Sequence, residues 1–250
     1  MVNVAAFLNR VGYAGSQEPT IETLRTLHRA YLYTVPFENL DIALGRKIVC
    51  DEEAFVRKIV ERRRGGFCYE MNGAFAALLR RLGFEVTLLS ARVPREDGSE
   101  SPEFDHLTLR VELDEPWLAD VGFGDSFLEP LRIENESEQS QDGRRFRIVA
   151  SGESLVVERI EPGGEWKPQY SFTLIPRRLE EFAPMCHYHQ TSPESHFTRK
   201  SLCSIATPEG RVTISDRRLI FTRDGKKEER ELGSDKEWYE TLKKYFGIVL

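Results

Sequence analysis

The spacing of apolar residues changes near Gly83, and this change constrains the fold of the 250-residue chain more than any other feature. Before Gly83, apolar residues recur every three or four positions, as they do along one face of a helix. After Gly83 they recur at every second position, as they do in half-buried strands. The sequence therefore predicts an α+β chain whose first third is helical and whose middle is built from strands.

Three helices are expected before Gly83. Thr20 precedes an apolar stripe and is a suitable N-cap for the first helix. Asp51 precedes the second helix, which is expected to end at the arginine and glycine block of residues 62–66, because basic residues followed by glycine favour a helix C-terminus. The third helix is expected to begin at position 67 or 68 and to end at Gly83.

A β-barrel or sandwich is expected at residues 84–175. Residues 106–113 alternate strictly, with their leucines and valine on one face, so His106 is expected to point away from that face. After a turn, a strand is expected at residues 117–123. Further strands are expected at residues 146–149, 155–160 and 170–174. The remaining segment mixes short strands with a terminal helix, which Ser234 and Glu237 are expected to cap.

The charge balance and the cysteines exclude several classes of protein. The 35 basic and 41 acidic residues give a net charge of −6, so neither nucleic acid nor an anionic membrane surface is an expected partner. The longest uncharged run, residues 182–193, has 12 residues and is too short to span a membrane. Because the N-terminus lacks the pattern of a secretory signal and the four cysteines form no CxxC pair, a cytoplasmic protein with reduced thiols is expected.

Cys68 lies where a reactive thiol is expected. If the two preceding glycines form a turn and Cys68 begins a helix, the unpaired N–H groups and the dipole of that helix stabilise a thiolate. The arginines at positions 62–64 would add positive charge, and the glycines would let a substrate carbonyl approach the backbone. A buried, inert cysteine is the alternative for any single cysteine, but this local sequence favours a reactive one.

A cysteine nucleophile needs a base and usually an acid that orients the base. His106 and Asp120, 38 and 52 residues beyond Cys68, are the candidates. Hairpin pairing places Asp120 opposite Leu109, on the order of 10 Å from His106 along the ladder. Taken singly, His106 fits a solvent-facing strand residue and Asp120 fits a surface carboxylate. The sequence around Asp120 is so apolar, however, that its carboxylate needs a partner to offset the cost of desolvation.

Five motifs, in this order along the chain, resemble those of the arylamine N-acetyltransferases. The resemblance covers residues 35–197, fades towards both ends, and leaves a C-terminal segment that is shorter than is usual in that family. The motifs are residues 35–40 (VPFENL), residues 64–70 (RGGFCYE), His106-Leu107, residues 120–124 (DVGFG) and residues 191–197 (TSPESHF).

The resemblance implies a three-domain, papain-like (cysteine-protease-like) fold. Its parts are an N-terminal helical domain at residues 1–83, a central β-barrel at residues 84–175, and a linker with an α/β lid domain at residues 176–250. It also implies a triad in which Cys68 is the nucleophile, His106 the base and Asp120 the group that orients the imidazole. The implied reaction is acetyl transfer from acetyl-coenzyme A to an aromatic amine or hydrazine through an acetyl-cysteine, with ping-pong kinetics.

Two sets of residues are candidates for binding these substrates. In the family, a short loop after the triad aspartate contacts the pyrophosphate of the cofactor through backbone N–H groups. Aromatic side chains suit an acceptor pocket, with ordinary core packing as the alternative. The candidates are Gly124, Asp125 and Ser126 for acetyl-coenzyme A and Phe37, Phe123 and Phe197 for the acceptor.

Arg64 and Glu38 are expected to form a buried ion pair beneath the active site, as the resemblance implies. A plain charge at the end of a helix is the alternative for Arg64. No metal is expected: Cys186, the two histidines that follow it and His196 have suitable ligand types, but their spacing matches no common zinc pattern.

Three other functions remain open at this point. A transglutaminase-like or papain-like hydrolase would use the same triad on an amide. An amide synthase related to the acetyltransferases would use the same cysteine to close a macrolactam. A non-catalytic binding module would leave the coexistence of Cys68, His106 and Asp120 without a reason.

Overall fold

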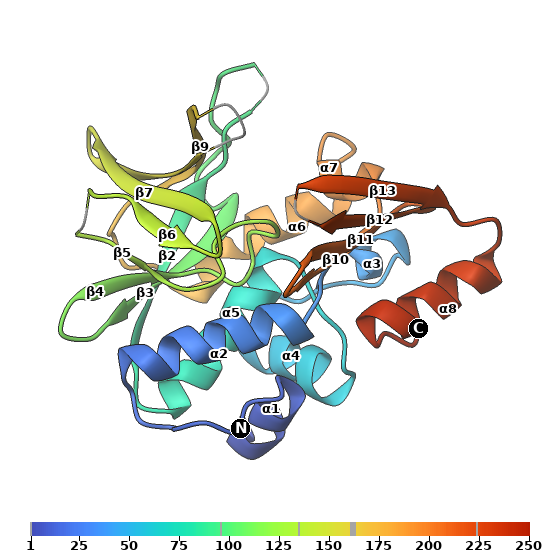
Figure 1. Cartoon of the computed structure of the whole chain (residues 1–250), viewed down its shortest axis with the longest axis horizontal. Coiled ribbons are helices and arrows are strands. Elements are labelled where there is room, and N and C mark those ends of the chain that lie inside the picture. Colours follow the sequence, from blue (N-terminus) through green and yellow to red (C-terminus); the bar gives the residue numbers. More distant parts are fainter. Residues whose placement is uncertain (1, 96, 135, 161–163, 224) are drawn as a thin grey trace.

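The chain folds into a helical N-terminal part and two β-sheets (Figure 1). The computed structural model describes residues 2–95, 97–134, 136–160, 164–223 and 225–250. In the orientation of Figure 1, the N-terminal helices lie at the bottom, the larger sheet lies at the upper left and the smaller sheet lies to the right. None of the helices within the described ranges is long and apolar enough to cross a membrane.

The N-terminal helices begin where the sequence predicts. The Thr20 side chain accepts a hydrogen bond from the N–H of Thr23, and the Asp51 side chain accepts one from the N–H of Ala54, so both predicted N-caps are confirmed. The second predicted helix changes to a π-helical segment before the arginine block. The elements are α1 (Val4–Arg10), α2 (Ile21–Thr34), α3 (Leu40–Ala43), α4 (Glu52–Val56), the π-helical segment Arg57–Glu61, and α5 (Cys68–Arg81).

The larger sheet is antiparallel and nearly closes into a barrel. Its order is β5-β4-β3-β2-β9-β8-β7-β6, and its two edges meet where the Gln139 side chain bonds to both the N–H (2.8 Å) and the C=O (3.0 Å) of Arg132. An α+β fold with a barrel-like sheet is therefore confirmed. The strands are β2 (Glu85–Arg92), β3 (His106–Glu112), β4 (Pro116–Ala119), β5 (Leu131–Arg132), β6 (Gln139–Gln141), β7 (Arg144–Ser151), β8 (Ser154–Ile160) and β9 (Trp166–Phe172).

Strand β4 is shorter than predicted, because it ends at Ala119 instead of continuing to position 123. The backbone N–H groups that follow bond to side chains instead of to a neighbouring strand: that of Asp120 to His28 and that of Val121 to Asn72. Ala119, not Asp120, lies opposite Leu109. The predicted register was wrong by one residue, and Asp120 lies just beyond the ladder.

The smaller sheet joins one strand from the N-terminal part of the chain to four strands from the C-terminal part. Strand β1 (Phe37–Glu38), which follows α2, pairs with β10 at its edge, and Phe37 lies opposite Ser204. The sheet order is β1-β10-β11-β12-β13, with β10 (Leu202–Thr207), β11 (Gly210–Ser215), β12 (Arg218–Arg223) and β13 (Lys226–Glu231). The connecting and terminal helices are the 3₁₀ segment Leu179–Phe182, α6 (Ala183–Thr191), α7 (His196–Arg199) and α8 (Asp235–Phe246), which Ser234 caps.

Three apolar clusters hold these parts together. The largest joins the N-terminal helices to one face of β3, so the predicted leucine face (Leu107, Leu109 and Val111) packs on helices. A second cluster fills the barrel, and a third lies between the smaller sheet and α8. The face of β3 that does not contact the helices is therefore available for polar chemistry.

Two glycines before α5 are required by close packing within the chain itself. A Cβ on Gly65 would lie 1.7 Å from the carbonyl oxygen of Pro36, and one on Gly66 would lie 2.5 Å from the Cβ of Glu70. The space beside these glycines is therefore filled by protein, and the expectation that it admits a substrate carbonyl was wrong. The glycines instead allow the turn to lie against the 36–38 segment.

Replacement of Gly65 tests this packing. Gly65→Ala is expected to lower the free energy of unfolding by about 2 kcal/mol, because the methyl group meets backbone atoms that do not yield easily. Gly233→Ala is the matched control, since its methyl group would be 3.7 Å from its nearest neighbour. Urea denaturation of both variants measures the difference, and equal midpoints for the two would contradict the packing account.

Candidate active site

Cys68 is the first residue of α5 and is almost completely buried, with 3% of its surface exposed. Burial raises the pKa of the Cys68 thiol well above its ordinary value, and the nearby Asp105 carboxylate raises it further. Hydrogen bonds from the backbone at Leu107 and Tyr69 lower this pKa but do not outweigh the burial. The helix N-terminus alone therefore does not ionise this thiol, and a partner must take the proton.

His106 and Asp120 are in direct contact. His106 Nε2 lies 2.6 Å from Asp120 Oδ2, and both residues are buried. The separation of roughly 10 Å expected from the strand register was wrong, because the chain leaves the ladder after Ala119 and the Asp120 side chain reaches the His106 ring from outside the ladder. His106 is not solvent-facing either: its ring lies 5.2 Å from the rings of Phe123 and Tyr170.

Asp120 stays ionised in spite of its burial. Burial alone would raise the pKa of its carboxyl, but the charge on His106 and hydrogen bonds from His106, Asn72 and Gly122 outweigh this effect and lower the pKa below its ordinary value. A buried carboxylate that is held in this way keeps its partner imidazole in one orientation.

Asn72 ties α5 to the strands that carry the other two residues. It lies one turn after Cys68, and its Nδ2 donates to the carbonyl oxygen of Leu107 (2.6 Å) and to Asp120 Oδ1 (2.8 Å). Its Oδ1 accepts from the N–H of Val121 at 2.9 Å. Next to it, a Cβ on Gly122 would lie 2.9 Å from the Cα of Cys68, so the segment after Asp120 packs directly on the start of α5. The start of α5, which carries Cys68, is thereby held against the segments that carry His106 and Asp120.

His28, on α2, holds the backbone of Asp120. Its Nε2 accepts from the N–H of Asp120 at 3.0 Å, so the proton of the neutral ring must be on Nδ1, which lies 2.8 Å from the carbonyl oxygen of Leu128. Burial lowers the pKa of His28 to about 4. Neither His28 nor Asn72 was among the site residues predicted from the sequence. The signal that could have found them is a polar side chain within the apolar stripe of a helix.

A buried cluster of five charged residues lies beneath the N-terminus of α5. The predicted pair is confirmed, since Arg64 Nη2 lies 2.7 Å from Glu38 Oε1, and Lys58 Nζ lies 2.8 Å from Glu70 Oε1. Asp41 contacts both cations, at 3.1 Å from Arg64 and 2.9 Å from Lys58. Arg64 was expected to add positive charge near Cys68. It is instead neutralised by the carboxylates of Glu38 and Asp41.

One carboxyl group of this cluster, that of Glu70, has a pKa near neutral pH. Burial raises the pKa of Glu70 to about 7, and the charge on Lys58 limits the rise. The other oxygen of Glu70 accepts from the N–H of Phe67 at 3.2 Å, immediately before Cys68. The cluster therefore holds the first turn of α5 in place.

The substrate-binding candidates divide into two groups. Phe37 and Phe197 lie beside each other, with ring centroids 6.2 Å apart, and Phe197 also contacts Phe67, the neighbour of Cys68. Phe123 makes a separate contact, with the ring of His106. In the loop at residues 124–126, Gly124 has a positive φ, the Asp125 carboxylate is held by arginines, and Ser126 is buried.

The cysteine and histidine segment makes hydrogen bonds within the protein. Cys186 Sγ lies 3.4 Å from Gln190 Nε2, and His189 lies between Asp105 (3.2 Å) and Ser195 (3.2 Å). Throughout the part of the chain that the structure describes, no three His, Cys, Asp or Glu side chains are grouped so that they could hold a metal ion.

Known proteins of one family are similar to this chain in sequence and in fold. A family model described as N-acetyltransferase matches residues 20–250. The arylamine N-acetyltransferase of Mycolicibacterium smegmatis is 34% identical over 256 residues, which cover 100% of this chain and 93% of that protein. The structure of the arylamine N-acetyltransferase from Salmonella typhimurium matches with a TM-score of 0.93 and 32% identity, over 98% of this chain and 90% of that one. The Mycobacterium marinum enzyme, solved in complex with CoA, matches with a TM-score of 0.91 and 31% identity, over 98% and 93%.

The role of His28 can be tested through the pH dependence of stability. Unfolded His28 takes up a proton near pH 6.5, whereas in the folded chain its pKa is about 4. The folded state therefore loses up to about 3 kcal/mol as the pH falls through this range. His28→Phe is expected to remove this dependence and to cost about 2 kcal/mol at pH 7.5, because two backbone groups lose their partners. Unfolding free energies from pH 4 to 7.5 measure both effects. The exposed His187→Gln should follow the wild type, and a His28→Phe curve parallel to the wild type would contradict the assignment.

Arg64→Ala tests the buried cluster. Removal of this cation leaves Glu38 and Asp41 short of positive charge in a buried site, so a loss of about 3–5 kcal/mol is expected. Arg62→Ala, at an exposed neighbouring position, is expected to change stability by less than about 0.5 kcal/mol. Chemical denaturation measures the free energy of unfolding of both variants. If Arg64→Ala is as stable as Arg62→Ala, Arg64 is a dispensable charge at the end of a helix.

Proposed function

The chain belongs to the arylamine N-acetyltransferase family, and we propose that it transfers the acetyl group of acetyl-coenzyme A to the nitrogen of an aromatic amine or hydrazine. The observation that carries this proposal is the contact between His106 and the ionised Asp120 beside a cysteine at a helix N-terminus. The CoA complex of the Mycobacterium marinum enzyme supports acetyl-coenzyme A as the donor.

In the first half-reaction, Cys68 accepts the acetyl group. Because His106 Nε2 is bound to Asp120, Nδ1 is the nitrogen that takes the proton from the Cys68 thiol. The sulfur attacks the thioester carbonyl carbon, the bond to the sulfur of coenzyme A breaks, and that sulfur leaves with the proton held by His106. Acetyl-Cys68 and free coenzyme A result.

The raised pKa of the Cys68 thiol is compatible with this step. Burial disfavours a lone thiolate, but transfer of the proton to an adjacent imidazole creates two opposite charges in contact and leaves the pair neutral. The carboxylate of Asp120 then offsets the charge of the imidazolium. Ionisation of Cys68 therefore depends on His106 and Asp120 together.

In the second half-reaction, the amine nitrogen attacks the carbonyl carbon of acetyl-Cys68. His106 removes a proton from that nitrogen, the bond between carbon and sulfur breaks, and the sulfur regains a proton as the N-acetyl product leaves. We assign the stabilisation of the negative oxygen in both tetrahedral intermediates to the N–H groups of Cys68 and Tyr69, which belong to the first turn of α5. Since both half-reactions use the same cysteine, ping-pong kinetics are expected.

The aromatic side chains around Cys68 suit a flat acceptor. Phe197 contacts both Phe37 and Phe67, and Phe123 lies against His106. We place the aryl ring of the acceptor between them, where stacking orients the amine nitrogen towards Cys68. Three papain-like domains, with boundaries at about residues 83 and 175, and a cytoplasmic location belong to the same proposal. The four free cysteines of the described chain are compatible with a reducing compartment.

Formation of the acetyl-enzyme is the direct test. Incubation with acetyl-coenzyme A alone is expected to add about 42 Da to the intact mass, on Cys68, by the chemistry of the covalent intermediate. Cys68→Ala should abolish the gain, whereas Cys203→Ala, at a buried cysteine in another core, should retain it. Asp120→Asn should slow the gain by about 10²–10⁴-fold. A hydrolase would show no stable adduct, and an adduct that persists in Cys68→Ala would contradict the assignment of the nucleophile.

A further inference from the structure

Arg10 and Arg63 line a cavity of about 380 Å³, which we call the Arg10 cavity. It lies where the ends of α1, α2 and α8 meet strand β10 and the turn before α5. Cys68, His106 and Asp120 are not among the residues that line it. The Arg10 cavity is therefore separate from the candidate active site.

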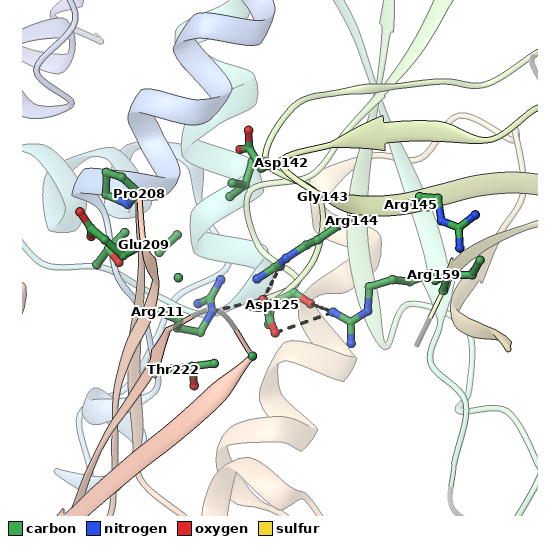
Figure 2. A pocket seen from close by; sticks show the side chains of 16 residues that line it. Asp125, Asp142, Gly143, Arg144, Arg145, Arg159, Pro208, Glu209, Arg211 and Thr222 are labelled. Carbon is green, nitrogen blue, oxygen red and sulfur yellow. Dashed lines mark hydrogen bonds and ion pairs between the residues drawn. The ribbon is translucent and has the colours of Figure 1, made fainter. Parts of the chain in front are cut away.

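Another cavity, between the barrel and the smaller sheet, shows how arginines are neutralised elsewhere in this protein. In Figure 2, Arg144, Arg159 and Arg211 are directed towards the carboxylate of Asp125. Asp125 Oδ1 lies 2.7 Å from Arg144 Nη1 and 3.3 Å from Arg211 Nε, and Asp125 Oδ2 lies 3.7 Å from Arg159 Nη1. The arginines of that cavity thus have a carboxylate partner within the protein.

The Arg10 cavity differs, because no Asp or Glu of the described chain lines it. Arg10 is 6% exposed, and within the described ranges its side chain bonds to carbonyl oxygens. Its Nε donates to Ile59 (2.9 Å), its Nη1 to Thr34 (2.7 Å) and its Nη2 to Arg64 (3.2 Å). Carbonyl groups satisfy N–H donors but carry no net charge. The buried charge of Arg10 is therefore not balanced by a carboxylate of the described residues.

Arg63 adds a second positive charge beside the first. Burial, together with the nearby charge of Arg63, lowers the pKa of Arg10 to about 10. Arg63 itself is exposed, and its guanidinium group makes no hydrogen bond or ion pair with the residues that the structure describes. Two like charges that lie close together repel each other, so a bound anion would stabilise both of them.

The rest of the lining offers hydrogen-bond donors and apolar surface. Arg10 has five N–H donors, of which three bond to carbonyl groups, so two are left for a ligand. The half-buried Tyr33 and Tyr245 line the cavity together with the buried Phe246 and Ile205. An apolar wall beside two cations suits a ligand that has an aromatic ring and an anionic group.

We propose that the Arg10 cavity binds an aromatic monocarboxylate, whose carboxylate bonds to Arg63 and Arg10 and whose ring packs against Tyr33 and Tyr245. Guanidinium groups present N–H donors in a fork that matches the two oxygens of a carboxylate. The volume is within the range of cavities that hold small ligands. A bare sulfate or phosphate would leave the apolar wall without a partner, which favours an acid that carries a ring.

The site is independent of the proposed acetyl transfer, because none of the groups that form it takes part in that reaction. Arg10 nevertheless connects the cavity to the turn before Cys68. Its Nη2 donates to the carbonyl oxygen of Arg64, whose side chain belongs to the buried charged cluster. Binding can therefore be measured without any assumption about catalysis.

Fluorine NMR of 4-fluorobenzoate in the presence of the full chain tests the site. Saturable broadening of the fluorine signal is expected with the wild type. Arg63→Asn is expected to weaken the affinity about tenfold, because the carboxylate loses a charged partner. Asparagine tolerates the positive φ of position 63 (51°), so this variant removes the charge and keeps the backbone conformation. Arg62→Asn, at an exposed neighbour that does not line the cavity, is the matched control and should bind as the wild type does.

The chemistry of the ligand is tested with the wild type alone. 4-Fluorobenzamide has the same ring but no charge, and it is expected to show no saturable broadening. Because this comparison needs no variant, it decides even if Arg63→Asn does not fold. Equal affinities for the acid and the amide would overturn recognition of an anion.

Two other results would overturn the proposal. One is the absence of saturable broadening by the wild type. The other is equal affinity of the wild type and Arg63→Asn, which would place the acid elsewhere, as in the acceptor pocket beside Phe37 and Phe197. Binding that Arg63→Asn weakens, in a protein that forms no acetyl-Cys68, would support the site and contradict only the proposed function, so the two failures are distinguishable.

Discussion

The buried carboxylate of Asp120 is the constraint on which the arrangement of this protein depends. An ionised carboxylate without partners is too costly to bury, and the partners of Asp120 come from different elements. His106 from β3 and Asn72 from α5 bond to its carboxylate, and His28 from α2 accepts a hydrogen bond from its backbone N–H. The bonds of this one residue therefore fix the relative positions of two helices and the barrel. Because Asn72 bonds to the carbonyl oxygen of Leu107 and Gly122 packs against Cys68, the same segment holds the start of α5 against β3. The interactions that stabilise the fold here are the interactions that assemble the site.

The charged cluster beneath α5 supports that site from the opposite side. Three carboxylates and two cations are buried together, and Glu70 bonds both to Lys58 and to the backbone just before Cys68. Such a cluster contributes little net stability compared with apolar packing, but loss of one member is costly, so it acts as a rigid support. Cys68 lies between the two networks, and in the reaction that we propose it would lose little freedom as a nucleophile, which is the benefit of preorganisation in catalysis.

The elements that sequence could predict are those whose cause is local. Thr20 and Asp51 cap helices because their side chains bond to backbone groups three residues later, and the alternation of β3 follows from one apolar face that packs on helices. The end of β4 could not be predicted, because the groups that end it, His28 and Asn72, are 92 and 49 residues away from the backbone N–H groups that they bind. The motifs indicated Cys68, His106 and Asp120, but spacing alone placed the last two far apart. The arginines that contact Asp125 lie on three separate strands, β7, β8 and β11, so no local sequence pattern predicts that they meet.

The central claim is that the Cys68 thiol loses its proton to His106 only while Asp120 holds the imidazole. The rate at which iodoacetamide alkylates Cys68, measured by mass spectrometry of the wild type and of Asp120→Asn at pH 7, tests this claim most directly. The account predicts rapid alkylation of the wild type, well above the rate of a free cysteine peptide, and a rate about 10²-fold lower in Asp120→Asn. Equal and slow alkylation of both proteins, rising only as the pH approaches the raised pKa of the buried thiol, would contradict it.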